Sequence, residues 1–283
     1  FFSNCTVTRD ECDQTAAEIA GEAVKPVQLQ GAFSYTVATG NLLVQFHVSD
    51  SLFDTKILGL AREIYGNIVP ASINKGFIGP SPSLAVYVMD MIPGITYIEA
   101  PVIKLQYASW HEQTVSDFAR FFANSWVNRP TEPYVPEHSL VDLQDQLDLL
   151  LQQLPSRFAE VISKLREELP TIFTPTYPLV LTHYDLCGMN IIVNPEAGGI
   201  TGVVYWAEAM VLPFDIPLWG FYNMLGIMNS SGWISNDDKH AMKIAERVGL
   251  VIRFGFTWKD GAERPVNEQD SSIRYLDAFL HRL

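Results

Sequence analysis

The residues best suited to chemistry stand together in one short stretch that contains His183, Asp185 and Asn190. Their spacing is His-x-Asp-x4-Asn, and apolar runs that are typical of strands flank them on both sides. The carboxylate could take a proton from a hydroxyl group, and the amide oxygen five residues later could hold a metal ion. Such spacing is typical of a loop that catalyses phosphoryl transfer.

Three short strands are expected to position this loop. Residues 179–182 precede it, residues 191–193 follow it, and a turn at 194–199 leads into a third strand at 200–206. We expect the two strands on either side of this turn to pair as a hairpin. Such pairing would bring Asp185 and Tyr205 close together in one cleft.

The rest of the chain changes character near residue 90. Before a Pro-Gly break, the patterns predict helices at 13–23 and 54–65 and strands at 27–30, 34–38, 42–48 and 84–89. After the break, helical spacing dominates, at 109–127, 140–154, 157–169, 216–228, 237–248 and 271–280. The sequence therefore predicts an α+β fold with a β-rich domain at 1–90. A mainly helical domain at 91–283 would carry the loop of residues 181–193.

Composition limits the classes of partner. The chain has 283 residues, a formal net charge of −13 and a pI near 4.8. Phosphates would be repelled over most of such a surface, so neither nucleic acid nor an anionic membrane is expected as a partner. The cysteines Cys5, Cys12 and Cys187 are too few for a disulfide framework. Together with apolar runs too short to span a membrane, they predict a cytoplasmic location with reduced thiols.

Several motifs together resemble one known family. They are the stretch 181–193, the stretch 199–208 with the following Leu212-Pro-Phe, and shorter pieces at 63–66 and 87–94. In combination these resemble the aminoglycoside-phosphotransferase and choline-kinase family, and its fungal members in particular. The resemblance covers residues 27–228 and implies a protein-kinase-like fold with a small β-rich lobe and a larger, mainly helical lobe.

The resemblance assigns roles to individual residues. Asp185 matches the carboxylate that orients and deprotonates the acceptor hydroxyl, and Asn190 matches the amide that binds metal. Residues 30–34, with Gly31 alone, stand where a turn would cover the nucleotide. Glu63 matches a helix carboxylate that pairs with a cation on a neighbouring strand.

Two positions depart from the family pattern. The strand cation should come from Gln45 or His47, and neither carries a permanent charge. Tyr205 replaces the carboxylate that bridges metal and phosphates, and a phenol is a poor magnesium ligand at neutral pH. Glu208 could take over as a metal ligand only if the backbone turns back. We therefore expect no bound cofactor, with ATP and Mg²⁺ as cofactors only if the kinase chemistry survives.

Plainer roles compete with these functional ones. His183 would then brace the loop, Asn190 would cap it, and Cys187 would be a small buried thiol. Tyr205 would fill the former metal site or donate a hydrogen bond to Asp185. The aromatic residues Trp206, Phe214, Trp219, Phe221, Tyr222 and Trp233 would line an acceptor pocket or belong to the core. The acidic residues Glu132, Glu137 and Asp142 would form a solvated face or hold an amine-bearing substrate.

Three hypotheses follow from these observations. The first is a small-molecule enzyme of this fold with impaired phosphoryl transfer, whose cleft serves another reaction, as in fungal specialised metabolism. Asp185 would be its general acid or base, with His183 and Tyr205 as hydrogen-bond partners, and its substrate would be a small, partly hydrophobic organic molecule. The second is an active ATP-dependent hydroxyl kinase, and the third is a non-catalytic pseudokinase that binds a ligand or a partner.

Overall fold

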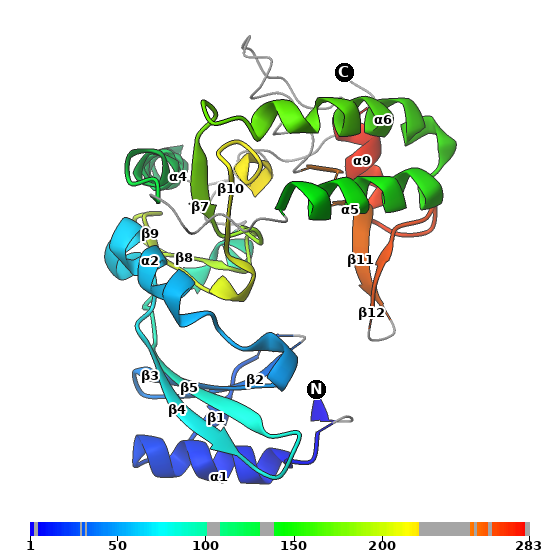
Figure 1. Ribbon diagram of the computed structural model, residues 1–283. Helices are drawn as coiled ribbons and strands as arrows, with labels where there is room; N and C mark the ends of the chain where they lie inside the picture. Colours follow the sequence, from blue (N-terminus) through cyan, green and yellow to red (C-terminus); the bar gives the residue numbers. More distant parts are fainter. Residues whose placement is uncertain are drawn as a thin grey trace. The chain divides into compact units, whose positions relative to one another are not determined.

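A computed structural model describes residues 1–2, 5–28, 30–31, 33–100, 108–130, 139–220, 250–251, 254–259 and 262–280 (Figure 1). The chain divides into two compact units. The first unit combines Phe1–Phe118 with Gly188–Glu208, and the second combines Ala119–Cys187 with Ala209–Leu283. These units are interleaved along the sequence, whereas the expected domains at 1–90 and 91–283 are continuous; that division stays a prediction.

A five-stranded antiparallel sheet forms the centre of the first unit. Its order is β1-β2-β3-β5-β4, and the strands are β1 (Lys25–Pro26), β2 (Ser34–Thr39), β3 (Leu42–His47), β4 (Ser72–Ile78) and β5 (Leu84–Asp90). The β2–β3 hairpin closes with Thr39 opposite Leu42, so the turn predicted at Gly40 and Asn41 is confirmed. Strand β4 was not predicted, because its sequence alternates poorly and most of its side chains are exposed or half-buried.

Both faces of this sheet are covered, because alternate residues of β5 belong to different apolar clusters. Leu84, Val86 and Val88 pack in a cluster with Cys12 and Ala16 of helix α1 (Arg9–Ala20). Ala85, Tyr87 and Met89 pack with Phe53 and with Leu58 of helix α2 (Thr55–Tyr65), which covers the opposite face. The sheet therefore lies between these two helices (Figure 1).

Capping residues fix where these helices begin and end. Thr8 and Glu11 form a capping box, and Gly21 ends α1 in the left-handed conformation. The predicted helix at 13–23 was therefore placed about four residues too late. Asp54 caps α2 by accepting hydrogen bonds from the backbone N–H groups of Lys56 and Ile57, so the helix predicted at 54–65 is confirmed.

A small three-stranded sheet completes the first unit. It contains β6 (Ile95–Thr96), β8 (Ile191–Val193) and β9 (Ile200–Val203). Strands β8 and β9 pair antiparallel, as predicted for the hairpin around residues 194–199. The strand predicted to reach residue 206 ends at Val203, because Tyr205 adopts a positive φ of 65° that no strand continues. The helix predicted at 109–127 is confirmed as α4 (Ala108–Val127), which contributes residues to both units.

The second unit is mainly helical. Its helices are α5 (Ser139–Gln153), α6 (Ala159–Glu168) and α9 (Ile273–Leu280), and its strands are β7 (Leu179–Thr182), β10 (Met210–Pro213), β11 (Phe256–Lys259) and β12 (Ala262–Pro265). Helices α5 and α6 run beside each other and pack against α9 through a leucine- and isoleucine-rich core (Figure 1). Strand β7 pairs antiparallel with β10. The predicted helix at 237–248 and most of the one at 216–228 lie outside the described residues.

Short 3-10 helices connect these elements. Their bounds are Ser49–Ser51, Gly66–Ile68, Tyr97–Glu99, Ser156–Phe158, Leu169–Ile172 and Trp206–Glu208. None of the helices in the described part of the chain is long and apolar enough to cross a membrane. The predicted α+β class is confirmed, with the larger sheet near the amino terminus and helices dominating the second unit.

Candidate functional site

A row of polar side chains crosses the sheet of the first unit. Register places Thr36 of β2 opposite Gln45 of β3, and Gln45 opposite Tyr87 of β5. Tyr87 belongs to the cluster that packs with α2, so this row lies on the α2 face of the sheet. Thr36, Gln45 and His47 are all at most 5% exposed. Buried polar groups of this kind require hydrogen-bond partners.

A continuous chain of hydrogen bonds supplies those partners. Gln45 donates through Nε2 to Thr36 Oγ1 at 3.1 Å, and its Oε1 lies 3.3 Å from Nε2 of His47. On the other side of the ring, Nδ1 of His47 lies 2.9 Å from the carbonyl oxygen of Ser51. At the opposite end of the chain, the Thr36 hydroxyl lies close enough to the Tyr205 hydroxyl to favour its ionised form. The network therefore joins Tyr205 to two residues predicted for the nucleotide site.

Burial keeps this network uncharged. It lowers the pKa of His47 to about 4, against a smaller opposing effect of the Ser51 carbonyl. Burial also raises the pKa of Tyr205, although the Thr36 hydroxyl works against it. Both side chains are therefore neutral at pH 7. Neither the strand cation nor the metal-bridging carboxylate implied by the family resemblance has a charged counterpart here.

Gln30 and Gly31, two residues of the turn predicted at 30–34, lie beside the same network. The Gln30 amide donates to Val27 O and Thr36 O at 2.9 and 2.8 Å, and it accepts from Thr36 N at 2.8 Å. A Cβ atom added at Gly31 would lie 2.8 Å from Ser34 Oγ and 3.6 Å from the Tyr205 ring. In the turn predicted to cover a nucleotide, Gln30 is thus bonded to β2, and Gly31 lies beside the tyrosine ring.

Glu63, the predicted helix carboxylate, is exposed on α2. Its side chain makes no ion pair with any residue in the described part of the chain. Neither Gln45 nor His47 offers it a cation, because the first is an amide and the second is a neutral imidazole. Glu63 therefore has the predicted helical position without the charged partner that the resemblance implies.

Asn190 directly precedes β8, and Glu208 follows β9; the surroundings of these two residues differ. Asn190 is 5% exposed, and its carbonyl oxygen accepts a hydrogen bond from Val204 N at 2.9 Å. Glu208 is exposed at the end of the 3-10 helix that follows Tyr205. Within neither unit do three His, Cys, Asp or Glu side chains of the described residues gather as metal ligands. With a neutral phenol at position 205, these donors do not fit the Mg-ATP that the resemblance implies.

The second unit holds the other part of the predicted loop. His183 follows β7 and is fully buried, and Asp185 is half-buried. Asp185 N donates to His183 O at 2.8 Å, and Cys187 N donates to Asp185 O at 2.9 Å. Between them, Tyr184 has a positive φ of 61°, as Tyr205 does in the first unit. Non-glycine residues in this conformation cluster at functional sites, because surrounding structure must hold them there.

Close packing fixes this loop against the start of the helical segment that follows Pro217. A Cβ atom added at Gly220 would lie 2.5 Å from Leu186 O, so only glycine permits this approach. Cys187 is a free, buried thiol that packs with Trp219 and Leu250. These contacts agree with the interpretation of Cys187 as a buried thiol, and they place Trp219 in the core.

The predicted site residues thus fall into two groups. The first unit brings together Tyr205, Gly31, Gln45 and His47, and it also contains Glu63, Asn190 and Glu208. Asp185 and His183 belong to the second unit. The expectation that Asp185 and Tyr205 share one cleft therefore stays a prediction.

The remaining predicted residues have ordinary environments or lie outside the described residues. Trp206 is buried against Tyr65, and Phe214 packs edge-on against Trp126. Asp142 is exposed on α5, as expected of a solvated face. Glu132, Glu137, Phe221, Tyr222 and Trp233 lie outside the part of the chain that the structure describes.

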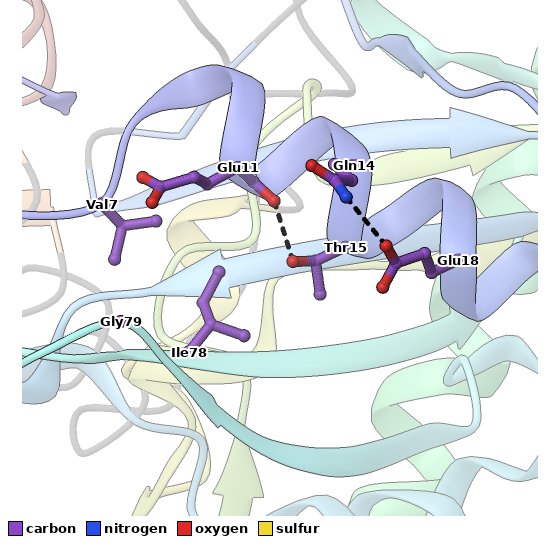
Figure 2. A pocket seen from close by; sticks show the side chains of 7 residues that line it. All are labelled: Val7, Glu11, Gln14, Thr15, Glu18, Ile78 and Gly79. Atoms are coloured by element: carbon purple, nitrogen blue, oxygen red, sulfur yellow. Dashed lines mark hydrogen bonds between the residues drawn. The ribbon is translucent and has the colours of Figure 1, made fainter.

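A separate surface pocket of about 260 Å³ lies between α1 and the end of β4 (Figure 2). None of the predicted site residues lines it. Its two carboxylates have local partners, since Glu11 belongs to the capping box and Glu18 accepts a hydrogen bond from Gln14. The pocket is therefore a feature of the α1 surface.

Sequence reasoning missed Thr36 and Ser51. Thr36 joins Tyr205 to Gln45, and Ser51 bonds the far side of His47. Polar residues at 34, 36, 45 and 47 alternate along strands that are otherwise apolar. That alternation was the available signal, because it places a polar row on one face of a predicted sheet.

A family model described as the phosphotransferase enzyme family matches residues 65–236, which is more than half of the chain. This range contains the predicted catalytic loop, the β8–β9 hairpin and Tyr205. No curated protein matches the chain.

Solved structures of this family have a similar fold. An aminoglycoside phosphotransferase APH(3'')-Id from Streptomyces rimosus, in complex with ADP and streptomycin, has a TM-score of 0.52 and 16% sequence identity, covering 89% of this chain and 94% of its own. A choline/ethanolamine kinase family protein from Mesorhizobium loti has a TM-score of 0.53 and 15% identity, covering 87% and 79%. The GDP complex of an aminoglycoside 2'-phosphotransferase IIIa variant has a TM-score of 0.54 and 12% identity, covering 94% and 86%. The predicted kinase-like fold is confirmed.

Proposed function

Because the chain belongs to the phosphotransferase enzyme family, we propose that it is a small-molecule enzyme of this fold in which Mg-ATP-dependent phosphoryl transfer is impaired. Its catalytic loop then serves another reaction, with Asp185 as general acid or base and a small, partly hydrophobic organic molecule as substrate. Specialised metabolism is the kind of pathway in which we expect an enzyme whose cleft has been adapted to another reaction.

One observation carries this proposal, the neutral network that joins Tyr205, Thr36, Gln45 and His47. Phosphoryl transfer depends on positive charge that neutralises the transferring phosphate, and removing one such electrostatic contact costs about 3–4 kcal/mol in other enzymes. Here two charged groups are replaced by a phenol, an amide and a neutral imidazole; the amide bonds the imidazole and Thr36, and Thr36 lies beside the phenol. Their hydrogen-bonding groups are already used within the protein, which favours a site that does not bind a nucleotide.

The half-buried position of Asp185 supports the enzymatic part of the proposal. Its loop is held by backbone hydrogen bonds and by a close glycine contact, so the carboxylate is presented by a rigid segment. Rigid presentation is what a general acid or base requires.

The test measures thermal stability of the full chain with and without millimolar Mg-ATP. A ligand stabilises a protein in proportion to its occupancy, so we expect almost no shift in Tm for the unmodified protein. Tyr205→Asp should restore a magnesium-dependent shift, since it supplies the anionic oxygen that magnesium prefers. The matched control is Tyr205→Phe, which also removes the phenol hydroxyl beside Thr36 but adds no charge, and it should remain unresponsive.

Different outcomes would support the two alternatives. Magnesium-dependent stabilisation of the unmodified protein, with ATP turnover that Asp185→Asn abolishes, would establish an active hydroxyl kinase and overturn the proposal. Binding of a small organic ligand that Asp185→Asn leaves unchanged, with no reaction of that ligand, would indicate a pseudokinase.

A further inference from the structure

A second pocket lies between helix α2 and strands β4 and β5, within the first unit. Its volume is about 150 Å³. Its polar lining comes from Thr55 and Arg62 of α2 and from Ser72 and Asn74 of β4, while Leu58 and Tyr87 contribute apolar surface. We propose that this pocket binds a small organic anion, a carboxylate or phosphate carried on an apolar group, with Arg62 as its charge partner.

Arg62 supplies the first argument. Its guanidinium donates through Nη1 to Val69 O at 2.6 Å and forms no ion pair with the residues that the structure describes. A guanidinium carries five N–H donors in a planar fork that matches carboxylate and phosphate oxygens. Arg62 is half-buried, so these donors have incomplete access to water. They are available for an anion.

The charge of the lining supports the same ligand. Arg62 is charged, and no carboxylate occurs among the described residues that line the pocket. The whole chain carries a formal charge of −13, so a pocket with a net positive lining differs in sign from the protein as a whole. An anion would therefore be held locally by Arg62 and repelled elsewhere on the molecule.

Ser72 supplies an independent observation. Its hydroxyl oxygen is buried and has no hydrogen-bond partner among the described residues. Buried hydroxyl groups are normally paired, and an orphaned group in a native structure calls for an unseen partner. Ser72 and Arg62 line the same pocket, so rotation about the Cα–Cβ bond of Ser72 would let its hydroxyl donate to the ligand that Arg62 binds.

The size of the pocket limits the ligand. Cavities of about 150 Å³ in other proteins hold one molecule of benzene size. Sites for larger ligands are usually about 300–1,000 Å³, so a nucleotide is too large for this pocket. The apolar side chains of Leu58 and Tyr87 would contact the ring or short chain that carries the anionic group.

Binding in this pocket would also affect helix α2. It carries both Arg62, which lines the pocket, and Glu63, which the family resemblance assigns to the nucleotide site. An anion on Arg62 would therefore stabilise the helix that presents Glu63. This inference does not rest on the proposed function, because the pocket contains none of the network residues.

The experiment titrates the full-length protein with benzoate, phenyl phosphate and uncharged benzyl alcohol, using isothermal calorimetry and ligand-detected NMR. We expect saturable binding of at least one anion and no comparable binding of benzyl alcohol. Arg62→Gln should weaken binding of the anion by about tenfold or more, because a charge-assisted hydrogen bond is lost. The matched control Arg274→Gln removes one exposed arginine of the second unit and should change the affinity by less than about twofold, since screening by salt limits distant charges.

A second variant tests the location without removing charge. A Cβ atom added at Gly59 meets nothing within 4 Å, and Gly59 lines the pocket. Gly59→Leu should therefore fill part of the pocket, favour the helix and abolish anion binding. The inference is overturned if neither anion binds the unmodified protein, if benzyl alcohol binds as tightly as benzoate, or if binding survives Gly59→Leu. Circular dichroism shows whether each variant is folded. If Arg62→Gln does not fold, the titration of Gly59→Leu alone tests the location of the site.

Discussion

The protonation of one buried side chain, His47, should make the stability of the protein depend on pH. The fold surrounds its ring with Phe53 and Tyr87 and leaves it 3% exposed. Desolvation disfavours the imidazolium, although the Ser51 carbonyl would accept a hydrogen bond from it. The sheet therefore holds a histidine in its neutral form at the position where the family resemblance implies a cation.

This depressed pKa predicts an acid-sensitive stability. The unfolded chain binds a proton at His47 as the pH falls through about 6.5, whereas the folded chain does so only near pH 4. The contribution to the free energy of unfolding is therefore fully present above pH 6.5 and is lost as the pH falls from 6.5 to 4. A shift of this size corresponds to about 3 kcal/mol. Urea unfolding between pH 4 and 7.5 should show a flatter pH dependence for His47→Gln; parallel curves for both proteins would contradict the assignment.

Thr36 connects the two ends of the network, and its hydroxyl predicts energetic coupling. Thr36→Val keeps the shape of the side chain but removes the hydroxyl that accepts from Gln45 and lies beside the Tyr205 hydroxyl, which should cost about 1–3 kcal/mol. Combined with Tyr205→Phe, the loss should be smaller than the sum of the two single losses, because both variants remove the same interaction between two neighbouring hydroxyl groups. Chemical denaturation of the four proteins gives this double-mutant cycle.

The same strand offers a control for that cycle. Thr39 donates its hydroxyl to Glu22 and has no bond to the network. Thr39→Val combined with Tyr205→Phe should therefore be additive within about 0.5 kcal/mol. Equal coupling in both cycles would show that the interaction energy does not come from the Thr36 hydroxyl.

At the scale of elements, alanine substitution at two glycines, one in helix α2 and one before strand β6, should change the free energy of unfolding in opposite directions. Gly59 lies inside α2, and nothing stands within 4 Å of an added Cβ. Gly59→Ala should therefore raise the free energy of unfolding by about 0.5–1 kcal/mol through helix propensity. Gly94 precedes β6 with φ +139°, and an added Cβ would lie 2.5 Å from Val193 O. Gly94→Ala should be destabilising, and Tm measurements on both variants would reveal the opposite signs.

The elements that the sequence predicted well share a local signal. Residues 191–203 form the expected hairpin because a turn-rich stretch separates two apolar runs, and α2 ends at Gly66 as its spacing predicts. Strands β10, β11 and β12 were missed because each has only four residues, too few for a distinct local pattern, and each is defined by its pairing with another strand. Helix α1 was placed too late because the capping box at Thr8 and Glu11 was overlooked.

The candidate site was predictable in part for a similar reason. Residue types at positions 45, 47 and 205 indicated missing charge, and the structure shows those side chains to be neutral. Their connection through Thr36 was not predictable, because Thr36 and Tyr205 are far apart in the sequence and meet only through the fold. Burial likewise decides the pKa of His47, and sequence does not give burial.

At the scale of the whole molecule, the net charge of −13 predicts how polycations behave toward this protein. Streptomycin is a small molecule with several positive charges at neutral pH, so it is an appropriate probe of an acidic surface. An acidic surface attracts such a cation over long distances at low ionic strength, where the Debye length is about 30 Å at 0.01 M salt, but only about 8 Å at 0.15 M. We therefore expect weak association that largely disappears at 0.15 M salt and that Asp185→Asn leaves nearly unchanged. Calorimetric titration with streptomycin at both salt concentrations measures this, and saturable binding at 0.15 M that Asp185→Asn weakens would instead indicate a substrate site for aminoglycosides.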